Sequence, residues 1–391
     1  MKKVAVMGCG IVGTGIVDIL TDKKEDIAKK LGEEIELKYI LEKRDCSAES
    51  FADKVIDDIN IILADSEVNI VAECIGGVGI AYEFIKKCLL AGKSVVTCNK
   101  HLVAEKGLEL LAIAREKGVS FVFEASVGGG IPILRPLTNC LAGNRINEVF
   151  GIINGTTNYI LTQMAECGQS FDEALADAQR LGYAEADPTA DVEGIDACRK
   201  ICILADLSFG HNIPPAAVKT QGITCVSGID SAFAELFGCS IKLLGRTVRS
   251  ENEMVTTFVA PHFVPKNALL ANVNGVMNAV VVRGDSVGEC LFYGAGAGRY
   301  PTASAMVGDI IDCVRHSEGC LYIDWGEERK EMQADSDEFE SRWYVRFKGD
   351  TAAAQQSIEG EKALITEPMS AYKMRESIGE ENILSAFRVL D

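Results

Sequence analysis

The sequence predicts an α/β protein that opens with a doubly wound parallel sheet and continues into a second domain with a sheet of its own. Three observations predict this. Short apolar runs alternate with amphipathic segments over the first 125 residues, a glycine-rich turn follows the first run, and the pattern changes beyond Pro132. With 391 residues, 48% hydrophobic and 25% charged, the chain has globular composition and the length of two or three domains.

Five short apolar runs in the N-terminal part predict buried strands. A predicted helix over residues 11–20 follows the first run, and later helical segments end at Gly92 and Gly118, which suit the left-handed position after a helix. Strands that alternate with helices imply right-handed crossovers and a sheet covered on both faces. The runs are Lys3–Met7, Leu37–Leu41, Ile70–Cys74, Ser94–Cys98 and Val119–Phe123.

Beyond Pro132 the predicted elements are mixed. A capping box, Ser170 with Glu173, opens a helix that stops at Gly182, and Pro301 marks the first turn of another helix. Further helices are predicted over 156–167 and 196–207, and strands over 148–153, 254–264, 278–285, 288–296, 342–347, 361–366 and 383–390. The acidic segment that begins near Gly319 is expected to be a solvated connection.

Charge and cysteine content exclude several classes of protein. The net charge is −18, so the chain lacks the basic surface that binding to nucleic acid or an anionic membrane requires. No apolar run reaches the ~18 residues of a membrane span. The 14 cysteines are scattered without a CxxC pair, which predicts free thiols in a cytoplasmic protein. Only four histidines occur, so lysines and carboxylates are the expected acid–base groups.

A G-x-G-x-x-G motif follows the first predicted strand and opens the first helix. Gly8 makes the tight turn, Gly10 lets the backbone approach a pyrophosphate, and Gly13 allows close packing of helix on sheet. The alternative is a purely structural glycine turn, which the strand–turn–helix context disfavours. The motif predicts Rossmann-type dinucleotide binding. Glu42 at the end of the second strand favours NAD and Arg44 favours NADP, so the choice of cofactor stays open.

Asn99 and Lys100 directly follow the predicted strand of residues 94–98. Ligands of open parallel sheets bind at the carboxyl ends of the strands, so Lys100 is placed to meet the nicotinamide or the reacting oxygen. An ordinary surface lysine is an equally good interpretation of its position alone.

Five carboxylates accompany one lysine in the run EADPTADVEGIDACRK, residues 185–200. Asp196 and Lys200 are four residues apart and share one helix face. A surface ion pair is the alternative, but the opposite helix face is apolar, which favours capture of a substrate ammonium group beside a protonated lysine. A polar turn over residues 154–159 offers donors for a carboxylate, or simply caps a helix.

Six motifs together resemble the homoserine dehydrogenase family, in order and in spacing, over roughly residues 1–318. The resemblance implies NAD(P)-dependent interconversion of L-homoserine and L-aspartate 4-semialdehyde, on the branch from aspartate to threonine and methionine. It also implies a homodimer or a dimer of dimers. The motifs are GCGIVG, VVTCNK, FEASVGGGIPI, NGTTNYIL, GYAEADPTADVEGIDACRK and GAGAGRYPTASAMVGDII.

The resemblance implies a role for each matching residue. Lys200 and Lys100 are catalytic lysines at the reacting oxygen, and Asp196 orients the site. The substrate-binding set is Glu185, Asp191, Gly155, Thr156 and Tyr183, with Glu185 on the amino group. The cofactor-binding set is Gly8, Gly10, Ile11, Val12, Gly13, Arg44, Ile75, Gly76, Asn99, Lys100 and Gly298. A site for Na+ or K+, made largely of backbone carbonyls, falls on Glu124, Val127, Gly129 and Ile131.

Two segments depart from the family pattern. Cys74–Gly77 lacks the hydroxyl residues that many members carry there, and the tail from Gly319 resembles the family's small ACT domain but lacks its Pro-Gly turn. We therefore expect a dinucleotide-binding domain over 1–136 with helix 301–318, and a substrate and dimerisation domain over 137–300. An acidic linker with a degenerate ACT-like module, or a dimer contact, is expected over 319–391.

The expected chemistry is hydride transfer to the aldehyde carbon, with lysine ammonium groups stabilising charge on oxygen and a proton passing through Lys200. It requires two ammonium groups, far apart in the chain, to meet at one carbonyl. Two alternatives stay open: another Rossmann-type amino-acid dehydrogenase, and a non-catalytic nucleotide-sensing protein. The presence of Lys100, Asp196 and Lys200 argues against the second.

Overall fold

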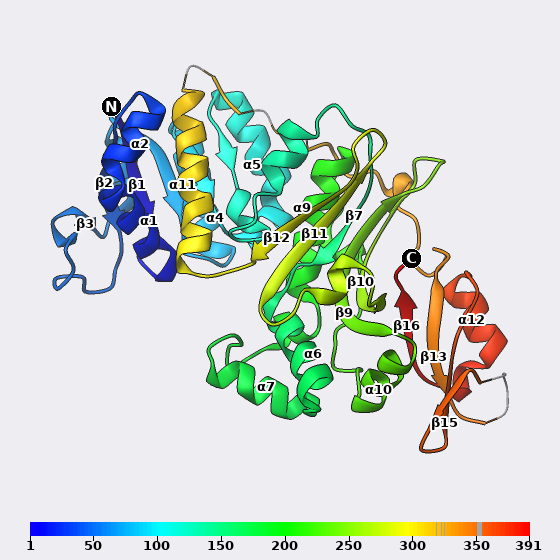
Figure 1. Ribbon diagram of the computed structural model, residues 1–391. Coiled ribbons are helices and arrows are strands. Elements are labelled where there is room, and N and C mark those ends of the chain that lie inside the picture. The colour runs from blue at the N-terminus through cyan, green and yellow to red at the C-terminus, as the bar shows by residue number, and fades with distance from the viewer. Residues whose placement is uncertain (318, 322, 324, 350–353) are drawn as a thin grey trace. The chain divides into compact units, whose positions relative to one another are not determined.

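The computed structural model describes residues 1–391 except 318, 322, 324 and 350–353 (Figure 1). The chain forms two compact units, the first comprising 1–142, 206–212 and 294–327 and the second 143–205, 213–293 and 328–391. The three-domain division expected from the sequence stays a prediction. A search of the described residues finds no helix that is both long and apolar enough to span a membrane.

The first unit is built on a six-stranded sheet whose neighbouring strands are all parallel, in the order β3-β2-β1-β4-β5-β6. This is the Rossmann order, with its topological switch between β1 and β4. The predicted doubly wound parallel sheet is therefore confirmed. The strands are β1 (Lys2–Met7), β2 (Ile35–Leu41), β3 (Val55–Ile56), β4 (Val68–Glu73), β5 (Ser94–Thr97) and β6 (Phe121–Val122).

One strand is shorter than predicted. The run Val119–Phe123 forms strand only over Phe121–Val122, because Phe123 leaves the extended conformation and leads into a tight turn at Glu124–Ser126.

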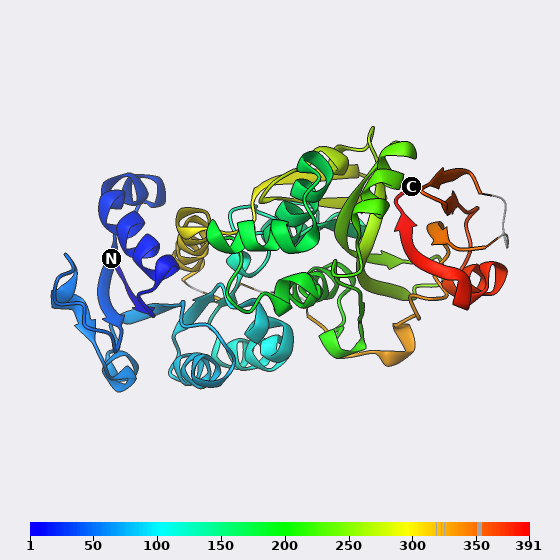
Figure 2. The ribbon, with the colours of Figure 1, turned by 90° about the horizontal axis from the view of Figure 1, so that it is seen from below.

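Helices lie on both faces of this sheet, α1 and α11 on one and α4 and α5 on the other (Figure 2). α1 approaches α11 closely because Gly15 has no side chain, and a Cβ there would lie 2.9 Å from that of Ala303. Their apolar side chains share one core with Val4 and Val6 of β1. The helices are α1 (Ile11–Asp22), α2 (Lys24–Leu31), α3 (Ile59–Ala64), α4 (Gly79–Leu90), α5 (Lys100–Lys117) and α11 (Arg299–Arg315).

The second unit contains a mixed sheet in the order β12-β11-β7-β9-β10-β16-β13-β15-β14, with β8 also paired to β10. The predicted strands of this region are present. β9 was not predicted. Both of its faces are largely buried, so its sequence lacks the alternation of apolar and polar residues that marks a half-exposed strand. The strands are β7 (Ile146–Ile152), β8 (Lys219–Thr220), β9 (Cys239–Arg249), β10 (Val255–Pro265), β11 (Met277–Gly284), β12 (Gly288–Ala295), β13 (Arg342–Phe347), β14 (Gln356–Ile358), β15 (Glu361–Ile365) and β16 (Ile383–Val389).

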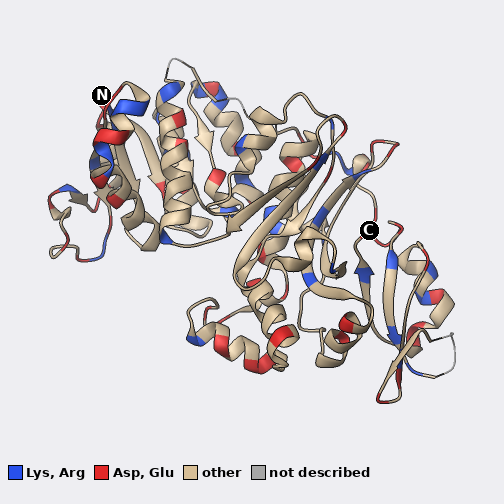
Figure 3. Cartoon of the chain, viewed as in Figure 1, with Lys and Arg blue, Asp and Glu red and all other residues tan. Residues whose placement is uncertain are grey.

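Four helices of this unit, α6, α7, α10 and α12, begin at side-chain caps. The predicted capping box of Ser170 and Glu173 opens α7. The first turn of α7 carries acidic side chains, which interact favourably with the positive end of the helix dipole (Figure 3). Asn154 caps α6, accepting a hydrogen bond from the amide of Thr157. The helices are α6 (Gly155–Cys167), α7 (Phe171–Arg180), α8 (Thr189–Val192), α9 (Ile195–Phe209), α10 (Gly228–Leu236) and α12 (Ala371–Ile378).

The C-terminal tail continues the sheet of the second unit. Its strand β16 pairs in parallel with β10, and Tyr344 of β13 stacks on Phe263 of β10 with ring centroids 4.0 Å apart. The fully buried carboxylate of Asp230 in α10 accepts hydrogen bonds from the Tyr344 hydroxyl at 2.9 Å and from Arg346 Nε at 2.8 Å. The tail is therefore part of this unit's core.

The acidic segment before the tail is not wholly solvated, which corrects the expectation from its charge. Trp325 is only 4% exposed and its indole N–H donates to Asn212 Oδ1 at 2.9 Å. The ring fits because Gly107 leaves room for it: a Cβ at Gly107 would lie 3.3 Å from the ring. One aromatic residue thus anchors the connection.

Candidate functional site

The turn between β1 and α1 gives each motif glycine a separate task. Gly8 has a positive φ of 90°, and a Cβ there would lie 2.9 Å from the carbonyl oxygen of Cys74. A Cβ on Gly13 would lie 2.0 Å from the carbonyl oxygen of Gly8. Gly10 has no atom within 4 Å of the same position, so the space beside the helix N-terminus is open. That space suits a pyrophosphate, and these residues fit a dinucleotide.

A cavity of about 370 Å³ adjoins this turn. Its wall includes Gly10 and Glu42 together with three apolar side chains, Ile75, Ile80 and Phe84. Ile75 is 40% exposed and Ile80 60% exposed, which is unusual for isoleucine in a folded domain. A mostly apolar pocket with a few polar groups beside a phosphate-binding turn suits an adenosine group.

Glu42 and Arg44 both lie beside the glycine-rich turn, where Glu42 accepts hydrogen bonds and Arg44 donates one. The Glu42 carboxylate accepts backbone N–H groups of Cys9 at 2.9 Å, Lys43 at 2.9 Å and Arg44 at 3.1 Å. Burial alone would raise the pKa of Glu42, but these hydrogen bonds hold it below its usual value. Arg44 donates through Nη2 to the Cys9 carbonyl at 2.5 Å, so its guanidinium reaches the motif.

The loops that follow β4 and β5 are tied together by Glu73, which sequence reasoning missed. Glu73 is fully buried, and its carboxylate accepts the amides of Ile75 at 2.7 Å and Gly76 at 3.0 Å. It also accepts the Thr97 hydroxyl at 2.5 Å. The signal was available, since an acidic residue inside the apolar run IVAEC has to be bonded internally.

Asn99 and Lys100 lie where the sequence predicted, at the carboxyl end of β5. Asn99 caps α5 and donates through Nδ2 to the carbonyl of Gly77 at 2.6 Å. Lys100 is the first residue of α5 and is half-buried. The structure therefore brings the Ile75–Gly76 and Asn99–Lys100 segments of the predicted cofactor set to adjacent strand ends.

Two glycine-rich motifs of the first unit pack against each other. A Cβ on Gly129 would lie 2.4 Å from the carbonyl oxygen of Gly296, and the amide of Gly130 donates to the carbonyl of Ala295 at 3.0 Å. Gly298, with φ of 129°, immediately precedes α11. Only residues without side chains permit this approach, which explains the paired GGG and GAGAG sequences.

The predicted cation loop is buried, and its one acidic side chain is already bonded. Glu124 is 4% exposed and its carboxylate accepts the amides of Ile133 at 2.6 Å, Leu134 at 2.9 Å and Arg135 at 2.7 Å. Val127 and Ile131 are fully or almost fully buried. Within the described part of the chain, no three His, Cys, Asp or Glu side chains are grouped to hold a metal ion.

In the second unit, Asp196 and Lys200 form a buried ion pair on α9. Lys200 Nζ lies 2.7 Å from Asp196 Oδ2 and donates to the carbonyl of Ile153 at 2.8 Å. Asp196 is 3% exposed and Lys200 7%. The alternative of an ordinary surface pair is therefore wrong.

Asn154 joins this pair to a third charged residue. Its Nδ2 group donates to Asp191 Oδ1 at 2.7 Å and to Asp196 Oδ2 at 2.9 Å. Its own Oδ1 accepts the amide of Thr157 at 2.8 Å, so the N-terminus of α6 fixes the orientation of both carboxylates. Asn154 belongs to the polar turn that the sequence singled out, but its role in bridging the acidic run was missed because the two are 37 residues apart.

Of the other predicted substrate residues, Gly155, Thr156 and Tyr183 lie at the start of α6. Thr156 Oγ1 donates to the carbonyl of Tyr183 at 2.7 Å, and the Tyr183 ring lies 5.1 Å from that of Tyr159. Gly155 is needed because a Cβ there would lie 2.7 Å from the carbonyl of Val276. Glu185 lies exposed on the following loop, where its carbonyl accepts the side-chain amide of Gln179.

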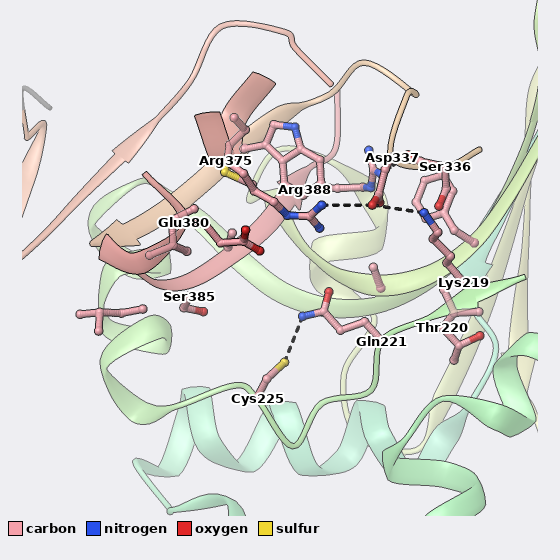
Figure 4. A pocket seen from close by; sticks show the side chains of 18 residues that line it. Lys219, Thr220, Gln221, Cys225, Ser336, Asp337, Arg375, Glu380, Ser385 and Arg388 are labelled. Carbon is pink, nitrogen blue, oxygen red and sulfur yellow. Dashed lines mark hydrogen bonds and ion pairs between the residues drawn. The ribbon is translucent and has the colours of Figure 1, made fainter. Parts of the chain in front are cut away.

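The second unit contains a cavity of about 640 Å³ where β8 and β10 meet β16 and α12 (Figure 4). On the wall of this cavity, Asp337 forms ion pairs with Lys219 at 3.2 Å and with Arg375 at 3.2 Å. None of the predicted site residues lines it, and it had no counterpart in the sequence reasoning.

Two family models match this sequence, one over the dinucleotide-binding part and one over the part that follows it. A family model described as "Homoserine dehydrogenase, NAD binding domain" matches residues 8–124, and one described as "Homoserine dehydrogenase" matches residues 132–311. The chain belongs to the homoserine dehydrogenase family. It is an NAD(P)-dependent oxidoreductase that acts on the CH–OH group of homoserine.

Curated homoserine dehydrogenases align with most of the chain. That of Pseudomonas aeruginosa is 46% identical over 314 residues, covering 80% of this chain and 72% of its own. That of Lactococcus lactis is 41% identical over 320 residues, covering 81% and 74%. These matches favour neither of the two alternative functions.

Solved homoserine dehydrogenases share the fold of the chain. The Thiobacillus denitrificans structure superposes with a TM-score of 0.92 at 36% identity, covering 100% of this chain and 98% of its own. A hyperthermophilic archaeal homoserine dehydrogenase mutant in complex with NADPH superposes with a TM-score of 0.67 at 28% identity, covering 80% and 98%.

Proposed function

We propose that homoserine binds in the second unit, at the cluster of Asn154, Asp191, Asp196 and Lys200. The observation that carries this proposal is the buried Asp196–Lys200 pair, whose ammonium group is also held by the Ile153 carbonyl. A neighbouring carboxylate favours the charged form of a lysine, and the hydrogen bonds to Asp196 and Ile153 fix the direction of Nζ. A positioned cation of this kind stabilises the negative charge that develops on a substrate oxygen.

The amino-acid end of the substrate is assigned to the residues around α6 and the acidic loop. Glu185 and Asp191 supply negative charge for the ammonium group. The amides of Gly155 and Thr156, at the positive end of α6, suit the carboxylate, and Tyr183 borders the same turn.

The chain's own residues then position and stabilise the reacting group. Bound NAD(P) supplies the hydride chemistry. Lys200 donates a hydrogen bond to the reacting oxygen, supplies its proton during reduction and takes it back during oxidation. Asp196 orients Lys200, and Lys100 is a second cation for the same oxygen. Only a neutral lysine can accept a proton, and the neutral fraction of a lysine rises with pH, so the oxidation of homoserine is expected to be favoured by alkaline pH.

NADP is proposed as the preferred cofactor. Three backbone amides already occupy the Glu42 carboxylate, which limits its capacity to accept a ribose hydroxyl. Arg44 reaches the phosphate-binding turn and suits the additional phosphate of NADP. Gly8, Gly10, Ile11, Val12 and Gly13 would hold the pyrophosphate, and Ile75, Gly76, Asn99 and Gly298 would border the rest of the dinucleotide.

A monovalent cation, Na+ or K+, is proposed at the carbonyls of Glu124, Val127, Gly129 and Ile131. The left-handed φ of 54° at Gly129 turns successive carbonyls within a buried loop, which suits a cation that prefers oxygen ligands. Loss of activity in a buffer whose cation is a bulky alkylammonium, with recovery on adding KCl, is the expected result.

A cytoplasmic location and a homodimer, or a dimer of dimers, are also proposed. All 14 cysteines are free thiols, as expected in a reducing compartment. The edge strand β12 leaves Tyr293 57% exposed, an apolar feature that a second subunit would cover. Sedimentation equilibrium measures the mass of the assembly, which is expected to be that of two or four chains.

A steady-state assay tests the catalytic proposal. The enzyme is given L-homoserine with NADP or NAD, and the products are identified directly. Formation of aspartate 4-semialdehyde with NADP more efficient than NAD is expected. Deamination of the substrate would indicate the alternative dehydrogenase, and cofactor binding without turnover would indicate a nucleotide sensor.

A further inference from the structure

Two cysteines face each other across the ends of β4 and β5. The strands are parallel, with Ala72 opposite Val96 and Glu73 opposite Thr97. The next residues in that register are Cys74 and Cys98, and both pack against the same core as Ala72 and Val96. Neighbouring strands lie about 4.8 Å apart, which is within the ~4.4–6.8 Å between the Cα atoms of disulfide-bonded cysteines.

Both thiols lie at the same place in the sheet. Cys98 Sγ lies 4.0 Å from the carbonyl oxygen of Glu73, the residue that precedes Cys74. Hydrogen bonding to Cys98 and burial raise the pKa of Cys74 well above its usual value.

This pair is accessible, unlike the neighbouring thiols. Cys74 and Cys98 are only partly buried, and Cys74 lines the 370 Å³ cavity. Cys9 and Cys46, which also lie close to the phosphate-binding turn, are 0% and 5% exposed. A reagent that enters the cavity meets Cys74 on its wall rather than Cys9 or Cys46.

Each cysteine adjoins a segment of the proposed cofactor site. Cys74 precedes Ile75 and Gly76, whose amides are fixed by Glu73. Cys98 precedes Asn99, whose side chain bonds the Gly77 carbonyl at 2.6 Å. A covalent bond would bring the two sulfurs to about 2 Å from each other, so the side chains must turn and the segments that follow them shift.

We propose that Cys74 and Cys98 form a reversible disulfide that weakens dinucleotide binding. The oxidant is a small-molecule disulfide, for which oxidised glutathione is the probe. One of the two cysteines, as its thiolate, attacks one of its sulfurs and releases one thiol; the other cysteine then gives up its proton and attacks the sulfur of the first, releasing the second thiol. Two protein thiols are oxidised and one small disulfide is reduced to two thiols. The effect on cofactor affinity rests on the proposed function of the two loops.

The test uses the full chain with its cysteines intact. The protein is incubated with oxidised glutathione, remaining thiols are alkylated, and peptides are mapped by mass spectrometry. NADPH binding is measured by calorimetry on the same samples. We expect a Cys74–Cys98 linked peptide and at least tenfold weaker NADPH binding, both reversed by dithiothreitol.

Variants assign the effect to the pair. Cys98→Ser and Cys74→Ala should each abolish the linked peptide, and each should bind NADPH with an affinity that oxidation changes by less than twofold. Cys140→Ser and Cys167→Ser, at exposed positions that belong to neither of the two loops, should respond as the wild type does. Comparing each variant with its own reduced form removes any effect of the substitution itself.

Three outcomes would overturn the proposal: a mixed disulfide with glutathione and no linked peptide, a linked peptide between other cysteines, or a Cys74–Cys98 link that leaves NADPH affinity unchanged. Neither readout requires turnover of homoserine. A failure of the proposed substrate assignment is therefore distinguishable from a failure of this proposal.

Discussion

Lys200 Nζ lies 2.7 Å from Asp196 Oδ2, with side chains 9% and 4% exposed. Removing two charges from water is expensive, and such a pair stabilises a fold less than a well-packed apolar pair would. Its neighbours are polar, since Asn154 bonds the same carboxylate oxygen at 2.9 Å. A buried and bonded ammonium of this kind is better explained by catalysis than by stability.

Lys200→Met should lower kcat by about 10²- to 10⁴-fold, the range for loss of a positioned general acid or charge stabiliser. The affinity for NADPH should stay within twofold. Steady-state kinetics and calorimetry measure the two quantities, and circular dichroism verifies folding, because removing one partner of a buried pair costs about 3–5 kcal/mol. Lys219→Met, which removes a lysine whose side chain is 54% exposed, is the control. Near-normal turnover of Lys200→Met would refute the assignment.

Gly10→Ala and Gly13→Ala should separate cofactor binding from folding. A Cβ at position 13 would lie 2.0 Å from the Gly8 carbonyl, so Gly13→Ala should lower the melting temperature and abolish NADPH binding together. A Cβ at position 10 meets no protein atom, so Gly10→Ala should keep the melting temperature within about 2 °C and still weaken NADPH binding about tenfold or more. Unchanged NADPH affinity in Gly10→Ala would contradict the proposed position of the pyrophosphate.

Arg44→Ala should lower kcat/KM with NADP more than with NAD. The lost ion pair to the additional phosphate is worth about 1.5–3 kcal/mol, so a 10- to 100-fold change in the ratio of the two values is expected. The control is Lys54→Ala, which also removes one positive charge, at a half-exposed lysine that forms an ion pair with Asp53. Equal changes with both cofactors would contradict the proposed preference.

The sequence predicted the sheet of the first unit well because its signals are local. Gly8, Gly10 and Gly13 have tasks that depend on a strand, a turn and a helix within a dozen residues. β9 and the pairing of β16 with β10 depend instead on distant partners. A strand buried on both faces has no alternation, and nothing local indicates that the tail extends another sheet.

Site residues divide in the same way. Lys200, Asp196, Asn99 and Lys100 were predicted from spacing and from family motifs. Glu73 was missed although two of its partners, the amides of Ile75 and Gly76, lie only two and three residues away. The bridging role of Asn154 was missed because its partner Asp191 lies 37 residues away. That Lys100 and Lys200 act on one carbonyl stays a prediction, since they belong to different compact units.

Asp230→Ala should destabilise the second unit strongly. Tyr344 and Arg346 would lose their buried acceptor, and loss of one partner of a buried ion pair costs about 3–5 kcal/mol. Glu235→Ala, which removes an exposed pair with Lys266, should cost less than about 1 kcal/mol. Urea unfolding in a Trp325→Phe background follows Trp343 of the same unit. Equal midpoints for the two variants would show that the tail is not anchored through Asp230.

His262 should make the second unit acid-sensitive. Burial, with Arg246 and Arg388 nearby, lowers the pKa of His262 to about 3. Between about pH 6.5 and pH 3 the unfolded chain therefore binds a proton that the folded chain does not, so stability falls as pH decreases.

His262→Phe preserves the stacking on Phe258 but cannot titrate. At pH 7 it should be about 1 kcal/mol less stable than the wild type, because it loses the hydrogen bond between Nδ1 and the Ala260 carbonyl. Below pH 6 the wild type should lose up to about 1.4 kcal/mol per pH unit more than the variant, since one pKa unit corresponds to that energy. Urea titrations at pH 7, 6 and 5, again followed by Trp343, measure this difference. Parallel stability curves would mean that His262 takes up its proton equally well in the folded and the unfolded chain, which its full burial near Arg246 and Arg388 opposes.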